Sequence, residues 1–197
     1  DTDTATLIGA GVIGRTMVMA ICEAIPTVKT IFLCDLDLEK AKQVAEEAGE
    51  KYDVTIIPTA DSKAAAAKSQ LIARTPFIDK DWVKPHSAIV CVSNEATTDI
   101  VKMADVNVVD YWKQMVTFKN KAITQVFDEG GITKEDILET SNLVLGKPCR
   151  TSDEQFIYAC SLGLGALDIT VAYALYQNAV KLGIGTKLKM WDKPLWE

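Results

Sequence analysis

The first half of the chain alternates short runs of β-branched and apolar residues with longer amphipathic stretches. Strands are predicted at residues 6–8, 30–35, 54–57, 70–73, 88–92 and 106–109. Amphipathic helices are predicted between the first three strands, at residues 12–24 and 38–50. Strands that alternate with helices in this order form a parallel sheet with crossover helices. The expected fold is therefore α/β, a doubly wound parallel sheet of about six strands.

After Asp110 the spacing of apolar residues becomes helical, and glycines and a proline supply the breaks. Helices are predicted at residues 112–118, 121–129, 134–145 and 154–182. Gly183 and Gly185 are expected to end the last of them, and no strand is expected in this region. The pattern thus predicts two domains, the sheet at residues 1–111 and a helical C-terminal extension at residues 112–197.

Composition and charge exclude several classes of protein. The 48% hydrophobic and 24% charged content is ordinary for a soluble protein, and no apolar run is long enough to span a membrane. A net charge of -6 repels nucleic acid and anionic lipid. A single histidine and five scattered cysteines predict no metal site and favour free thiols in a reducing cytoplasm. The first residues have no signal-peptide pattern.

The stretch GAGVIG follows the first expected strand directly and opens the first expected helix. In this position Gly9 permits the tight turn, Gly11 lets a phosphate approach the backbone, and Gly14 allows close packing of helix on strand. Val12 and Ile13 lie where the helix dipole and free N–H groups attract phosphate. The motif in this context predicts a Rossmann-type domain that binds a dinucleotide.

Asp35 ends the second expected strand, about 20 residues past the last glycine of the motif. A carboxylate there accepts hydrogen bonds from the ribose hydroxyls and repels the 2′-phosphate of NADP. The next residue is Leu36 and not an arginine that would bind this phosphate, so the sequence favours NAD. The alternative role, capping the following helix, fits Asp37 better.

Four stretches together resemble the ornithine cyclodeaminase and mu-crystallin family over nearly the whole chain. They are GAGVIG with IFLCDLDLEKA, RTPFIDKDWVKP, ADVNVVDYWKQ, and TSDEQFIYACSLGLGALDITVAYALYQNAVKLGIGTKL. The resemblance implies that the turn Ser161, Leu162, Gly163 lies near the nicotinamide, with Asp168 in the next helix. The expected cofactor contacts are Gly9, Gly11, Val12, Ile13, Gly14, Asp35, Leu36, Ser93, Leu162 and Gly163.

The chain departs from the family in ways that leave its catalytic residues unassigned. The family's preceding segment, which carries substrate-binding cations, is expected to be missing, so the chain is either a fragment or a variant with a degraded site. One strand runs directly into Arg74, Thr75 and Pro76, where relatives have a longer threonine-rich end. The strand that ends at Ser93 passes to Asn94 and Glu95, where relatives place a catalytic aspartate.

The remaining polar candidates are interpreted structurally. Asn94, Glu95 and Asp99 have the composition of a turn that caps a helix. Asp168, within an apolar helix, needs a partner if it is buried. His86 is expected in a surface turn and Cys160 as a buried thiol.

The resemblance implies an NAD-dependent enzyme that converts L-ornithine to L-proline and ammonia through an imine, with hydride returned within one cycle. The alternatives are a ketimine reductase, an alanine-type dehydrogenase, or a nucleotide-binding protein without turnover, as in mu-crystallin. The C-terminal helical region is expected to complete the site and to contribute to a substrate or dimer domain. The expected partners are a small-molecule substrate and a second copy in a homodimer.

Overall fold

A computed structural model describes residues 2–73, 78–92, 96–189 and 191–192 of the chain. The chain divides into two compact units, Asp1–Leu162 and Gly163–Glu197, and each is described by itself. The expected cofactor contact Ser93 and the loop candidates Asn94 and Glu95 lie outside the described residues, as does the segment at 74–76.

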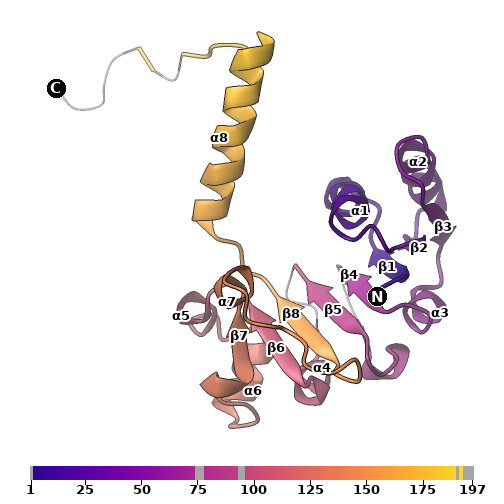
Figure 1. The fold of residues 1–197 in the computed structure, drawn as a ribbon, viewed down its shortest axis with the longest axis vertical. Coiled ribbons are helices and arrows are strands. Elements are labelled where there is room, and N and C mark those ends of the chain that lie inside the picture. Colours follow the sequence, from indigo (N-terminus) through magenta and orange to yellow (C-terminus); the bar gives the residue numbers. More distant parts are fainter. Residues whose placement is uncertain (1, 74–77, 93–95, 190, 193–197) are drawn as a thin grey trace. The chain divides into compact units, whose positions relative to one another are not determined.

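The first unit is built on an eight-stranded sheet in which every paired strand is parallel to its neighbour. Its strands are β1 (Thr4–Ile8), β2 (Thr30–Cys34), β3 (Thr55–Thr59), β4 (Leu71–Ala73), β5 (Ala88–Cys91), β6 (Val106–Val109), β7 (Ile137–Glu139) and β8 (Ile157–Cys160). The spatial order is β3-β2-β1-β4-β5-β8-β6-β7 (Figure 1). The order reverses direction between β1 and β4, and ligands of doubly wound sheets bind at such a switch point.

Helices cover both faces of this sheet. They are α1 (Val12–Ala24), α2 (Leu38–Gly49), α3 (Ser62–Ala66), α4 (Thr98–Met103), α5 (Trp112–Met115), α6 (Ala122–Asp128) and α7 (Thr140–Val144). On β1, Leu7 packs in one core with α1 and α2, whereas its neighbour Ile8 packs in a second core with α3, α4 and α6. Successive side chains of a strand point to opposite faces, so the two cores lie on opposite sides of the sheet. This arrangement confirms the doubly wound α/β fold.

The prediction of a purely helical region after Asp110 is wrong. Residues 137–139 and 157–160 form strands β7 and β8, and β8 lies between β5 and β6 in the interior of the sheet. The run IYAC is too short for its period to separate a buried strand from a helix, and it lies within the stretch 154–182 that apolar spacing predicts as one helix. Because β7 and β8 pair with β6, the first unit extends to Leu162, beyond the expected boundary at residues 111 and 112.

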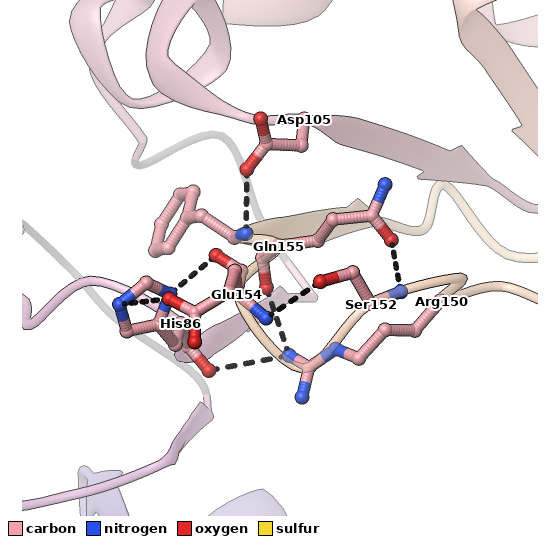
Figure 2. A network of polar contacts seen from close by, with 7 residues as sticks. His86, Asp105, Arg150, Ser152, Glu154 and Gln155 are labelled. Carbon is pink, nitrogen blue, oxygen red and sulfur yellow. Dashed lines mark hydrogen bonds and ion pairs between the residues drawn. The ribbon is translucent and has the colours of Figure 1, made fainter.

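A network of polar contacts holds the segment before β8 to its two neighbouring strands (Figure 2). On the β6 side, Asp105 Oδ2 accepts a hydrogen bond of 2.8 Å from the Phe156 N–H. On the β5 side, His86 Nε2 lies 3.0 Å from Glu154 Oε2, and its Nδ1 bonds the Glu154 carbonyl. Arg150 joins the β5 side to the segment before β8 by donating to the His86 carbonyl at 3.3 Å and the Gln155 carbonyl at 3.1 Å. These contacts fix the register of β8, and thereby the place of the turn at its other end.

The second unit contains one long helix, α8 (Gly165–Leu182), which agrees with the C-terminal part of the helix expected at residues 154–182; the expected N-terminal part is not helical. Helix α8 ends at Gly183, whose φ of 66° is the left-handed conformation that glycine adopts most easily. All of its residues except Ala179 are exposed, including Leu167, Ile169 and Tyr173. Among the described residues, no helix combines the length and the apolar character that crossing a membrane requires.

Candidate functional site

The glycine motif forms the turn between β1 and α1 at the carboxyl edge of the sheet. Gly9 has a φ of 102°, which favours glycine, and its N–H donates to the Cys34 carbonyl at 2.7 Å. Gly11 is the N-cap of α1 and Gly14 is buried within the helix. Among the described residues, no side chain caps α1, and its first turn has no acidic residue, so its positive end is suited to an anion.

Gly11 has no structural need to be glycine within the described residues. Its φ of -71° is accessible to any residue, and a Cβ placed there meets no atom within 4 Å. Next to it, Val12 and Ile13 are 86% and 52% exposed. A side chain at Gly11 would occupy the space in front of the helix N-terminus, which is where a pyrophosphate binds in this motif.

Asp35, directly after β2, ties the glycine turn to the neighbouring strand end. Its Oδ2 accepts from the Ala10 N–H at 2.7 Å and its Oδ1 accepts from the Asp37 N–H at 2.9 Å. These two backbone donors hold the pKa of the carboxyl below its usual value, so Asp35 stays ionised. Each carboxylate oxygen accepts more than one hydrogen bond, so both retain capacity for ribose hydroxyls.

Asp37 has the capping role that the sequence analysis gave it, because its Oδ1 accepts from the Lys40 N–H at 3.4 Å at the start of α2. The ammonium of Lys40 lies 3.3 Å from the Asp37 carboxylate. This pairing leaves Asp35 without a basic side chain in hydrogen-bonding contact among the described residues.

A cavity of about 380 Å³ adjoins Asp35 on the β2 and β3 side of the glycine turn. It is lined by Ile8, Gly9, Cys34, Asp35, Leu36, Ala60, Ser62 and Trp82. The volume lies in the range of about 300 to 1,000 Å³ that small-ligand sites occupy. Leu36 is 96% exposed at its edge, and burial raises the pKa of Cys34 to about 12, so this thiol is neutral.

Sequence reasoning did not identify Trp82 and Ser62 as site residues. Each follows a different strand, and the switch-point topology brings them to the same cavity as Asp35. The available signal was Trp82 itself, a large aromatic side chain in the mostly charged segment DKDWVK after an expected strand.

A second polar group lies at the carboxyl end of β8, farther along the same edge. Asp110, which follows β6, is 9% exposed. Its Oδ2 accepts from the Ser161 hydroxyl at 3.0 Å and from the Leu162 N–H at 2.8 Å. The turn expected near the nicotinamide is divided between the two units. Leu162 is the last residue of the first unit, and Gly163 is the first residue of the second. Asp110 was not among the predicted site residues.

The other candidates have structural surroundings. His86 lies in an exposed turn with a φ of 67°, and Cys160 is a buried thiol whose pKa is raised by burial, as expected for both. Asp99 is exposed in the first turn of α4 and pairs with Lys80 at 3.2 Å. Asp168 is exposed in the first turn of α8. In the part of the chain that the structure describes, no three metal-ligating side chains gather to hold an ion.

Known proteins resemble this chain in sequence and in fold. A sequence model of the ornithine cyclodeaminase/mu-crystallin family matches residues 1–183. Among curated proteins, the chain is 30% identical to N-((2S)-2-amino-2-carboxyethyl)-L-glutamate dehydrogenase of Staphylococcus aureus, over 94% of the chain and 58% of the relative. It is 26% identical to Delta(1)-pyrroline-2-carboxylate reductase of Bacillus cereus, over 94% of the chain and 60% of the relative.

A similar solved structure is that of Thermococcus litoralis Delta(1)-pyrroline-2-carboxylate reductase in complex with NADH and L-proline. Its TM-score is 0.79 at 26% identity, and the match covers 95% of this chain and 61% of that one. The chain therefore spans about 60% of the length of these relatives.

Proposed function

The chain belongs to the ornithine cyclodeaminase/mu-crystallin family, and on this premise we propose that it acts as an NAD(H)-dependent oxidoreductase. The bond concerned is the carbon–nitrogen bond at the α-carbon of an amino acid or its imine. The observation that carries the proposal is Gly11, which neither its backbone conformation nor its packing requires to be glycine. A dinucleotide phosphate in front of α1 supplies the missing reason.

The described residues support binding of the adenosine and pyrophosphate parts of the dinucleotide. Free N–H groups at the start of α1 bind the pyrophosphate, and the Asp35 carboxylate accepts from the adenosine ribose. The cavity beside Leu36 and Trp82 receives the adenosine end. When bound, the nicotinamide supplies the hydride acceptor or donor. The role of the chain is to hold the cofactor in place at the carboxyl edge of the sheet.

We infer that NAD is preferred over NADP. A 2′-phosphate at this ribose would meet the ionised Asp35, and the neighbouring Leu36 offers no hydrogen bond to it. The nearby Lys40 is already paired with Asp37.

Two substrate classes are consistent with the family. Conversion of L-ornithine to L-proline and ammonia is the specific reaction that the sequence resemblance suggested. Reduction of a cyclic or open-chain imine, or the reverse oxidation of an amino acid, is supported by the relatives at 26 and 30% identity, which are a reductase and a dehydrogenase. We propose imine reduction as the primary activity, with ornithine cyclisation as the second candidate.

The two reactions differ in their net use of the cofactor. Imine reduction, tested with NADH and Delta(1)-pyrroline-2-carboxylate, consumes NADH in proportion to the amine formed. Ornithine cyclisation, tested with L-ornithine and a trace of NAD, releases ammonia while NADH stays flat. Steady NADH growth with ornithine indicates an amino-acid dehydrogenase. Binding of NADH with no turnover in any assay supports a binding protein of the mu-crystallin kind and contradicts the enzyme proposal.

We also propose a homodimer in the cytoplasm. Large apolar side chains of α8 are exposed, with Ile169 at 71% and Leu182 at 70%. A large exposed apolar surface normally marks a contact with other protein. All five cysteines are free thiols, which suits a reducing compartment. Light scattering at several concentrations tests the assembly, and a monomer at every concentration would contradict it.

A further inference from the structure

Asp110 connects two strand ends that lie far apart in the sequence. Its Oδ2 accepts from the Ser161 hydroxyl and the Leu162 N–H, while its Oδ1 accepts from the Tyr111 N–H at 2.9 Å. From the β5 side, the Ser161 N–H donates to the Cys91 carbonyl at 3.1 Å. The turn after β8 is therefore held by β5 on one side and by a buried carboxylate on the other.

The hydrogen bonds from Ser161 and Leu162 to Asp110 lie beyond the last residue pair of the β6–β8 ladder. The β6–β8 ladder ends with Val109 paired to Cys160, so Ser161 and Leu162 receive no ladder contact from β6. A buried carboxylate is costly unless hydrogen bonds satisfy it, and an apolar residue after β6 would avoid that cost. The placement of this carboxylate thus needs a reason beyond the pairing of the strands.

The turn occupies the place where the second half of a dinucleotide would lie. The cavity beside Asp35 accommodates one end on the β2 and β3 side of the glycine turn, so the other end extends over β4, β5 and β8. Strands are about 4.8 Å apart, which places the end of β8 about 14 Å from β1. Leu162 is thus at the nicotinamide end of the edge.

The surroundings of Asp110 include a second charge. Lys121, the N-cap of α6, is 8% exposed. Burial is the chief cause that raises the pKa of Cys160; the charge of Asp110 also raises this pKa, whereas that of Lys121 lowers it. Lys121 and Asp110 thus both act on the buried thiol at the end of β8.

We propose that Asp110 is a positioning residue for the nicotinamide half of the cofactor. By fixing the Ser161 hydroxyl and the Leu162 N–H, it sets the turn in its binding position before the cofactor arrives. It contacts no reacting atom in this account. The inference rests on the proposed function, since it assumes that NAD(H) binds along this edge.

The test compares NADH with ADP-ribose, which lacks the nicotinamide. Calorimetry on the folded chain should show that Asp110→Ala weakens NADH binding about tenfold, because the turn must then be ordered when the cofactor binds. ADP-ribose affinity should change less than about twofold, since this ligand lacks the nicotinamide ring that we expect beside the turn. Asp110→Asn, which keeps an acceptor, should recover much of the loss. Asp99→Ala, on an exposed aspartate of α4, is the matched control and should change neither affinity.

The outcomes separate this inference from the function on which it rests. If the wild-type chain binds neither ligand, the proposed function fails. If the wild type binds both but Asp110→Ala weakens both equally or neither, the positioning role is overturned. Should Asp110→Ala fail to fold, Ser161→Ala removes only the hydroxyl donor. That variant must still lose NADH affinity selectively, and equal effects on both ligands would overturn the inference.

Discussion

Substituting Gly11 with alanine separates a structural glycine from one required by a ligand. The position has a φ of -71° and open space where the methyl group would lie, so the folded chain accepts it without strain. Alanine is a poorer N-cap than glycine, by up to about 1 kcal/mol. It also stabilises the folded state by about 0.4 to 1 kcal/mol, because the unfolded chain loses conformational freedom. The two effects oppose, and we expect the free energy of unfolding to change by less than about 1 kcal/mol.

Binding of NAD should respond much more strongly to Gly11→Ala. The added methyl group lies in the space that the pyrophosphate needs, and an extra methylene in a packed contact costs about 1 to 3 kcal/mol. That cost corresponds to an affinity loss of about 5- to 150-fold. Calorimetric titration measures the affinity, and chemical denaturation of the same samples measures the stability.

Gly49→Ala is the matched control for this substitution. Gly49 ends α2, and a Cβ there also meets nothing within 4 Å. Alanine in a helix should stabilise the chain by about 0.5 to 1 kcal/mol and leave NAD affinity unchanged. If Gly11→Ala binds NAD as tightly as the wild type, Gly11 does not face the dinucleotide. If it unfolds the chain, a packing role has been overlooked.

Three further predictions concern specificity, thiol chemistry and the fastening of β8. Asp35→Ser combined with Leu36→Arg should shift preference from NAD to NADP, because it exchanges a repelling carboxylate for a guanidinium that binds phosphate. Titration of both nucleotides checks this shift. A wild type that already prefers NADP would contradict the role of Asp35. In the native chain, iodoacetamide should modify the half-buried Cys149 before Cys34, which is 2% exposed with a pKa of about 12. Mass spectrometry reports the order of modification. Modification of Cys34 first would refute the assigned burial. Asp105→Ala should lower the free energy of unfolding by about 1 kcal/mol by removing the acceptor for the N–H before β8, and unchanged denaturation would show that this contact contributes nothing.

The first half of the fold was predictable because its elements repeat in a regular order. Helix α1 has the bounds that the apolar spacing predicted, and Asp37 caps α2 as its position suggested. Strand β8 was missed because four apolar residues have no distinguishing period, and its place between β5 and β6 depends on distant contacts at Asp105 and His86. The spacing of apolar residues predicts individual helices and strands, whereas the position of a central strand in the sheet depends on contacts with neighbouring strands.

The candidate site divides in the same way. Gly9, Gly11 and Asp35 lie in one short βαβ segment, so their spacing alone indicated a shared site. Trp82 and Asp110 reach the edge of the sheet from separate crossovers, and no sequence spacing relates them to the glycine turn. Residues such as Trp82 and Asp110 can be assigned to the site only once the order of the strands in the sheet is known.

Amide chemical-shift mapping of the isotope-labelled chain during titration with NADH tests the central claim most directly. The account predicts saturable shifts at Gly9 to Gly14 and at Asp35 and Leu36, with a second group at Ser161 and Leu162 from the nicotinamide half. The glycine-turn amides should also shift with ADP-ribose, whereas the β8 turn should respond only to NADH. A folded chain whose glycine-turn amides do not move at saturating NADH would contradict the assignment of this edge as a dinucleotide site.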